Sequence, residues 1–299
     1  MSNLPVNDVN GTTSTKVISD QVRESTTVMK PKGRLERGRK AFSPMLQLQR
    51  LVILVAIILV WNWAIKIKLL NPIYAATPRQ TFGELISLLG QGLFWKDFSI
   101  TLREALFGWV VGSSLGLVAG LILGRFRYTQ RLFGPYLTFF NAVPKIALAP
   151  IFILWFGVGQ NSKIVTAILS VFFIVQIPTT AAVSLINPDY DTVARTMGAT
   201  ERQRFVHVYF PGVLPAVFGA LRLGAVISLL TVVFTEFLAS SGGLGELLLE
   251  STNNFNMKTA FALMIVLSLL ALIINGAVGF VERRVLRWND TSKQVAVSL

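Results

Sequence analysis

The chain has 299 residues, of which 53% are hydrophobic and only 14% are charged. Soluble domains carry about a quarter charged residues, so this composition argues against a water-soluble globule. The sequence has no cysteine and one histidine, which excludes disulfides, thiolate metal sites and thiol catalysis and argues against a Ser-His-Asp triad. The composition therefore favours a membrane protein without a metal site.

The first 49 residues form a polar, basic segment with no apolar periodicity. Such a segment cannot bury a core, and we expect residues 1–49 to be a flexible tail. The first long apolar run follows only after about fifty residues and lacks a small-residue cleavage site, so we do not interpret it as a signal peptide. A second short tail is expected over residues 290–299.

Apolar runs divide the remaining chain. A hydrocarbon core needs about 20 apolar residues per helix. Runs of this kind predict six spans, at about 51–66, 104–124, 132–157, 162–186, 213–238 and 258–281. Pro144 and Pro150 interrupt the third and Pro178 lies in the fourth, which membrane helices tolerate when neighbours satisfy the freed backbone groups. The predicted fold is an all-α membrane domain over residues 50–289, with a short interfacial helix over 81–90.

The basic residues predict the orientation. Nineteen of the 28 Lys and Arg residues fall in the two terminal segments and in the loops 125–131 and 187–212, which six spans would place on one side. The positive-inside rule puts that side, with both termini, in the cytoplasm. The net charge of +13 then follows from topology, and we expect contact with anionic lipid rather than with nucleic acid.

Glycines recur at four-residue intervals along the second predicted span. This spacing lines one helix face with small residues, so that another helix backbone can approach closely. We therefore predict a helix-packing seam at Gly108, Gly112, Gly116, Gly120 and Gly124.

The loop 187–212 has helix signals that a plain connection does not need. Asp189 or Asp191 is a candidate N-cap of a short helix, and Gly198 a candidate end for it. Thr200 and Gln203 have the capping-box spacing that opens a second helix.

The first of these short helices has an apolar face. Val193 and Met197, with Ala194 beside them, would share that face. Because a cytoplasmic loop needs no apolar face unless something docks on it, we expect a partner to bind here.

Two ionisable residues lie within or near the fifth span. Arg222 and Glu236 are candidates for the solute path, because charges in the membrane are costly and tend to face a cavity or a partner. The alternatives are that Glu236 lies in the outer headgroup zone and that Arg222 snorkels or bonds to backbone carbonyls. Lys145, between two prolines, is expected to stabilise a kink.

The loop resembles the signature of the inner-membrane permease subunits of binding-protein-dependent ABC importers. The pattern is Glu-Ala-Ala, three residues, Gly, nine residues and Ile-x-Leu-Pro. Here Ala194, Gly198 and Pro211 hold the second alanine, the glycine and the proline at the required spacing. Thr192 stands where glutamate is usual and Val193 at the first alanine.

Other stretches are similar to the sulfonate/nitrate/taurine branch of this family. They are residues 143–157, 219–224, 235–245 and 282–288, in the order and spacing of the family. The resemblance covers about residues 50–289. It implies the permease fold of type I ABC importers and a multi-pass position in a prokaryotic plasma membrane.

The resemblance also implies a mechanism. Two copies of the subunit, as a homodimer or with a close relative, would form the channel and receive solute from an extracytoplasmic binding protein. Each would seat a coupling helix, at about 189–198, in one of two ATP-binding cassette subunits, which bind ATP and magnesium. The residues assigned to this coupling, with Asp191 as a replacement for the missing glutamate charge, are Asp191, Thr192, Val193, Ala194, Met197, Gly198 and Pro211.

The chain itself has no Gly-x-x-x-x-Gly-Lys-Ser/Thr phosphate loop, so we expect a transport subunit rather than an enzyme. The solute stays open among a sulfonate, taurine, nitrate, bicarbonate and a pyrimidine or flavin precursor. The alternative function is a self-sufficient secondary transporter or channel, although the two halves of the chain do not resemble each other as transporter repeats do.

Overall fold

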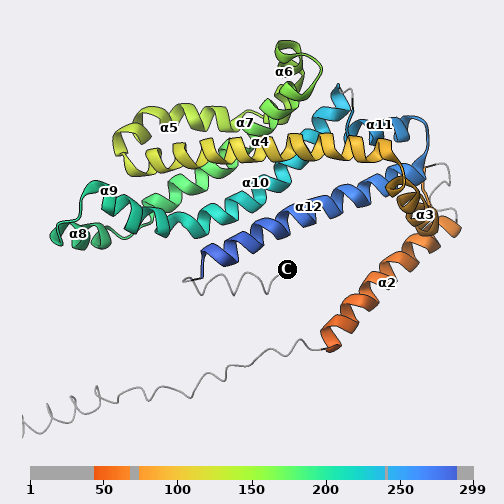
Figure 1. Ribbon diagram of the computed structural model, residues 1–299, viewed down its shortest axis with the longest axis horizontal. Coiled ribbons are helices and arrows are strands. Elements are labelled where there is room, and N and C mark those ends of the chain that lie inside the picture. The colour runs from red at the N-terminus through yellow and green to blue at the C-terminus, as the bar shows by residue number, and fades with distance from the viewer. Residues whose placement is uncertain (1–43, 68–73, 240–241, 288–299) are drawn as a thin grey trace, which may run out of the picture. The chain divides into compact units, whose positions relative to one another are not determined.

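The computed structural model describes residues 44–67, 74–239 and 242–287 (Figure 1). The chain divides into two units, Met1–Ile57 and Ile58–Leu299, and the division falls within α2 (Pro44–Lys66). The predicted tails, 1–49 and 290–299, lie outside the described residues except for the last positions of the first tail, which belong to α2. The second unit contains every helix from α3 to α12.

The described residues after α2 are helical, with short connections. The elements are α3 (Pro78–Leu89), α4 (Gly92–Arg125), α5 (Arg127–Ala142), a 3-10 turn (Lys145–Leu148), α6 (Ala149–Phe156), α7 (Gln160–Ser184), α8 (Pro188–Thr196), α9 (Glu201–Arg204), a π turn (Phe205–Tyr209), α10 (Phe210–Leu238), α11 (Leu244–Asn253) and α12 (Met257–Val285).

The all-α membrane fold is confirmed. Five helices are long and apolar enough to cross a membrane, namely Gln47–Lys66, Gly92–Arg125, Gln160–Ser184, Glu201–Leu238 and Met257–Val285, and a bent pair brings the number of candidate spans to six. That pair, Arg127–Ala142 and Lys145–Phe156, corrects the third predicted span, because it is broken by 79°. The break follows from Pro144, which disfavours helical backbone at Val143; Val143 is accordingly extended, with φ −67° and ψ 129°.

The helices before the core, α3 and α4, agree with one prediction and differ from another. The short helix expected over 81–90 is present as α3, and Thr77 and Gln80 form a capping box at its start. α4 begins at Gly92, well before the predicted start at residue 104. Its first turns contain Lys96, Asp97 and Arg103. These charged residues lower the mean hydropathy of the segment, so apolar length alone does not predict that the helix begins here.

The glycines of α4 face α7 along its length. A Cβ added at any of the five positions would come within 2.5–2.7 Å of an α7 atom, closer than real Cβ atoms approach their neighbours. Several of the facing α7 residues also recur every four positions, so the two helices meet along matching rows. The α7 side chains nearest to the added Cβ atoms are Ala167, Val171, Val175, Thr179 and Val183.

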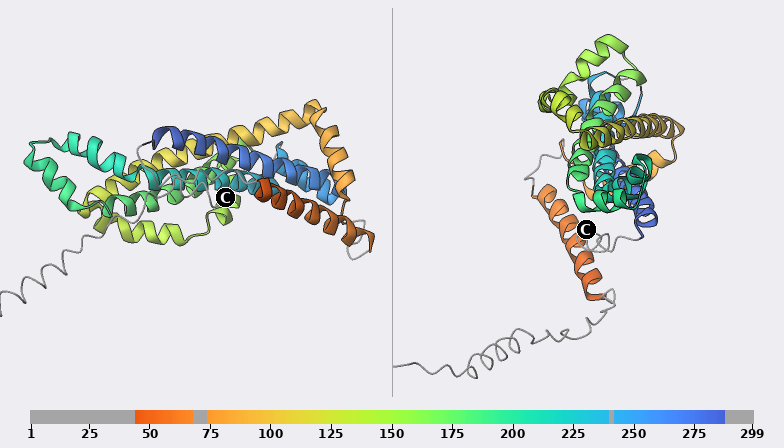
Figure 2. Two further views of the ribbon diagram at one scale, coloured as in Figure 1. Left: turned by 90° about the horizontal axis from the view of Figure 1, so that it is seen from below. Right: turned by 90° about the vertical axis from the view of Figure 1, so that its left-hand side faces the viewer.

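α10 and α12 complete the core of this unit. A buried apolar cluster joins α4, α7, α10 and α12, and it includes Ala105, Ala167, Leu229 and Leu270. α8 and α9 lie at one end of this helical unit, and α3 and α11 lie at the other (Figures 1 and 2). One end has a chain of ion pairs around α8 and α9, and the other has a buried cluster of charged residues.

Candidate functional site

α8 begins and ends on local signals. Its N-cap is Asn187, whose side chain accepts a hydrogen bond from the backbone N–H of Asp189 at 2.9 Å, so the expectation of an aspartate cap was wrong. An amide oxygen two residues ahead reaches this N–H as well as a carboxylate would. Gly198 follows the helix with φ +78°, a conformation that side chains with a Cβ rarely adopt. The predicted capping box of Thr200 and Gln203 opens α9 and is confirmed.

The apolar side chains of α8 are exposed. Val193 is 55% exposed and Met197 81% exposed, with Tyr190 on the same face. These side chains line one wall of an open groove of about 1000 Å³, whose other walls come from α7, the π turn and the start of α10. Ala194 lines this groove, and Pro211 lies in the first turn of α10. The surface is thus an apolar projection on a short, well-capped helix.

Asp191 ties α8 to α9. Its two carboxylate oxygens accept hydrogen bonds from Nη1 of Arg204 at 2.8 and 2.9 Å, and Nε of Arg195 donates to it at 3.0 Å. Burial alone would raise the pKa of the Asp191 carboxyl, but hydrogen bonds and charge from Arg204, then Arg195, hold that pKa below its usual range. Asp191 is therefore a charged anchor for the loop.

The same ion-pair chain reaches the membrane helices. Arg204 also pairs with Glu201, which accepts a hydrogen bond from Nη2 of Arg125 at 2.9 Å. Arg125 is the last residue of α4. α8 is thereby connected, through α9, to the helix that carries the glycine seam.

A second polar cluster is buried at the opposite end. The ammonium of Lys163 lies 2.9 Å from Glu104 Oε2 and 3.8 Å from Glu236 Oε1. The three residues come from α7, α4 and α10, and none of them is more than 2% exposed. Paired buried charges of this kind hold helices in one arrangement, since separating them would leave a charge without compensation.

The cluster also holds the segment that leads into α11. Glu236 Oε2 accepts from the backbone N–H of Gly245 at 2.7 Å, and Thr101 donates to Glu236 Oε1 at 2.8 Å. A Cβ at Gly243 would lie 2.1 Å from Glu236 Oε1, and one at Gly245 would lie 2.6 Å from the Val233 carbonyl. The glycines of this segment thus permit its close approach to a buried carboxylate.

Arg222 makes a separate contact between helices. It forms an ion pair with Glu282 of α12. Its guanidinium packs closely on Gly279, where an added Cβ would lie only 2.8 Å from Arg222 Nη2. Arg222 and Glu236 are not brought together, and neither borders the cavity described next. Their role in the solute path stays a prediction.

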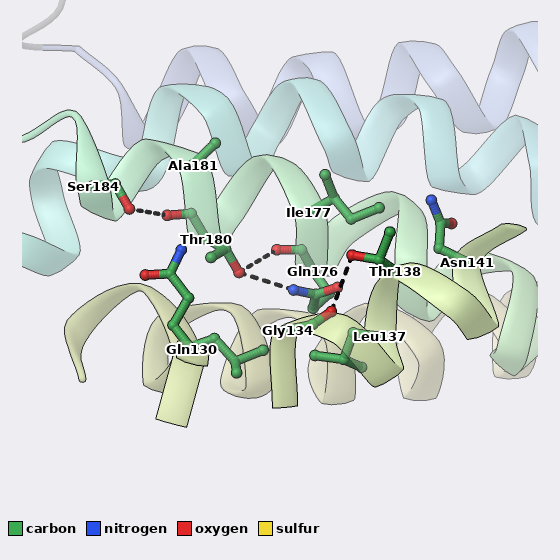
Figure 3. Close-up of a pocket in the computed structure, with 11 residues that line it drawn as sticks. Gln130, Gly134, Leu137, Thr138, Asn141, Gln176, Ile177, Thr180, Ala181 and Ser184 are labelled. Atoms are coloured by element: carbon green, nitrogen blue, oxygen red, sulfur yellow. Dashed lines mark hydrogen bonds between the residues drawn. The ribbon is translucent and has the colours of Figure 1, made fainter. Parts of the chain in front are cut away.

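A cavity of about 420 Å³ with a partly polar, mainly apolar wall lies between α5 and α7 (Figure 3). Leu123, Leu137 and Ile177 form apolar parts of its wall. The described residues that border it carry no formal charge, and their polar members are Gln130, Thr138, Asn141, Gln176, Thr180 and Ser184. Gln176 is 5% exposed and points from α7 toward Gly134 and Thr138 of α5 (Figure 3).

With this geometry in view, the comparison with known families is decisive. The family described as "Binding-protein-dependent transport system inner membrane component" matches residues 112–287, from the middle of α4 through α8 to the end of α12. The chain belongs to this family. It is therefore an inner-membrane, multi-pass importer permease of the ABC type, as the sequence resemblance predicted.

The permease has relatives with different stated solutes. It is 30% identical to the riboflavin transport system permease protein RibX of Chloroflexus aurantiacus, over 79% of this chain and 88% of that one. It is 24% identical to the taurine transport system permease protein TauC of Escherichia coli, over the same shares. A bacterial ABC transporter involved in the import of the polysaccharide alginate has a chain that matches with a TM-score of 0.59 at 14% identity, over 91% of this chain and 98% of that one, which shows the fold.

Sequence reasoning about the permease missed two groups of residues. Glu104 is the first residue of one predicted span and Lys163 the second residue of another, and Glu236 lies near the corresponding end of a third. Three ionisable residues at the same ends of three spans could have indicated a cluster. The cavity residues Thr138, Asn141 and Gln176 gave no signal, because single polar residues in a span do not indicate which helix they face.

Proposed function

We propose that the chain is the membrane-spanning subunit of an ATP-driven importer, that it acts as a pair of permeases, and that α8 docks on a separate ATP-binding subunit. The observation that carries this proposal is the exposed apolar face of Val193 and Met197, on a helix whose ends are fixed by Asn187 and Gly198. ATP and magnesium would be bound by two such partner subunits, and an extracytoplasmic binding protein would deliver the solute.

The ion pairs at α8 suit it to transmit movement. A force on α8 would pass through Asp191 and Arg204 to Glu201, and from Glu201 to Arg125 at the end of α4. α4 in turn packs closely on α7 along the glycine row. Because these contacts join short elements to long ones without an intervening flexible segment, displacement of α8 would move α4 and α7 with it.

The solute is a small polar molecule. RibX and TauC are named for riboflavin, which is uncharged, and for taurine, which is a zwitterionic sulfonate. These relatives support two solute classes for this chain, an uncharged heterocycle of the flavin type and a sulfonate. Pyrimidines, nitrate and bicarbonate come from the sequence resemblance.

The docking of α8 can be tested by co-purification from native membranes. Val193→Asp and Met197→Asp place a charge on the apolar face, and because both side chains are exposed, neither change should impair folding. We expect the wild-type chain to recover an ATP-binding subunit and each variant to lose it. Arg202→Glu, an exposed charge change on α9, is the matched control and should retain the subunit.

The opposite outcome is equally clear. Recovery of the chain without an ATP-binding subunit, across several mild detergents, would favour a self-sufficient secondary transporter or channel. Undiminished recovery with Val193→Asp and Met197→Asp would show that α8 is not the docking element.

A further inference from the structure

The hydroxyl groups around the cavity between α5 and α7 already donate their protons in hydrogen bonds within their own helices. Each donates to a backbone carbonyl of its own helix: Thr138 to Gly134 at 3.0 Å, Thr180 to Gln176 at 3.0 Å, and Ser184 to Thr180 at 3.1 Å. A hydroxyl has one proton and two lone pairs. These groups therefore offer a ligand lone pairs, which accept hydrogen bonds.

Gln176 adds an acceptor without a partner. Its Nε2 donates to Thr180 Oγ1 at 2.9 Å, whereas no donor among the described residues reaches its Oε1. A buried carbonyl oxygen left in this state is costly, and a ligand N–H or O–H would remove the cost. α5, which covers this oxygen, has no buried residue, so it is the wall of the cavity with the least packing to lose on opening.

Lys145, which bonds to the lining residue Asn141, already has its own partners. Lys145 Nζ donates to the backbone carbonyl of Asn141 and to its Oδ1, at 2.9 Å for the latter, and lies 4.9 Å from the centre of the Phe173 ring. Asn141 thus keeps its amide N–H groups for a ligand. A sulfonate that entered here would lose its hydrating water and meet mostly hydrogen-bond acceptors. Its desolvation would be costly, because the described lining residues include no charged side chain.

We propose that this cavity is a solute subsite that selects uncharged molecules with N–H or O–H donors beside a carbonyl acceptor, the pattern at the edge of a lactam-type heterocycle. When α5 opens away from α7, the donors meet Gln176 and Thr138, the carbonyl meets Asn141, and the ring lies against Leu137 and Ile177. The volume of about 420 Å³ is in the range of small-molecule sites. This assignment rests on the proposed transport function and chooses between its two solute classes.

The test is equilibrium binding to the detergent-purified chain, with its ATP-binding subunit where the two co-purify. Riboflavin and uracil serve as uncharged probes with ring N–H donors, and ethanesulfonate as an anion without such donors. We expect an uncharged probe to bind more tightly than ethanesulfonate. Gln176→Leu and Thr138→Val each remove one acceptor and should weaken that binding about 3- to 10-fold, the value of one hydrogen bond.

The control is Gln160→Leu, the same change at an exposed position in the first turn of α7, and it should leave affinity unchanged. A preference for ethanesulfonate, the absence of binding by both uncharged probes, or equal affinity in Gln176→Leu and wild type would each overturn the assignment. These failures differ from failure of the transport proposal, which would appear as a chain that recovers no ATP-binding subunit.

Discussion

The glycine row of α4 makes a sharp prediction about packing. In Gly116→Ala the added methyl would lie 2.5 Å from the Phe172 carbonyl oxygen and 3.1 Å from Val175 Cβ. The carbonyl belongs to the α7 backbone and cannot rotate away, so the two helices must separate by several tenths of an ångström. A gap of about 0.5–1 Å already forfeits a quarter to a half of each contact along the seam.

This separation sets the expected magnitude. Overpacking of a tight interface costs about 1–3 kcal/mol, and the better helix propensity of alanine returns at most about 1 kcal/mol. We therefore expect Gly116→Ala to lower the free energy of unfolding by about 1–2 kcal/mol. Each kcal/mol lowers the melting temperature by about 2–4 °C.

The assay is thermal unfolding of the detergent-purified chain, followed by tryptophan fluorescence. Gly276→Ala in α12 and Gly219→Ala in α10 are matched controls, because a Cβ at either position meets nothing within 4 Å. They should melt at the wild-type temperature or slightly above it. If Gly116→Ala melts together with the two controls, the seam does not depend on the absence of a side chain.

Two further predictions concern the polar clusters at the ends of the helical unit. Lys163→Met leaves Glu104 and Glu236 buried without their cation and should destabilise the chain by about 3–5 kcal/mol, with partial recovery on adding Glu104→Gln; equal melting of Lys163→Met and wild type would contradict the cluster's role. At the other end, Arg204 and Arg195 lower the pKa of Asp191 in the folded chain. The carboxylate therefore contributes its full stability above its ordinary pKa of about 4, and this contribution is lost only as the pH falls through the lower pKa of the folded state. Recovery of the ATP-binding subunit should therefore be constant between about pH 5 and pH 8 in wild type and reduced throughout this window in Asp191→Asn, and a wild-type loss confined to pH 5–7 would assign the coupling to another group.

Much of the fold could be predicted because the bilayer imposes a simple rule on the sequence. Apolar length identified the regions of α7, α10 and α12. Capping chemistry identified α9, since the side chains of Thr200 and Gln203 each accept a hydrogen bond from the other residue's backbone N–H, a contact that depends on local sequence only. The rule failed where other forces compete. The charged first turns of α4 hid its true start, and Pro144 divided one apolar run into two helices at 79° to each other.

The interior of the site could not be predicted for a different reason. An exposed apolar face such as that of Val193 and Met197 is a property of one helix, and helical spacing reveals it. The cavity depends instead on which faces of α5 and α7 oppose each other, so that Thr138 and Gln176 acquire meaning only as neighbours. Arg222 shows the same limit, because its charge alone predicts a place in the solute path, and only the structure shows that Glu282 of α12 pairs with it.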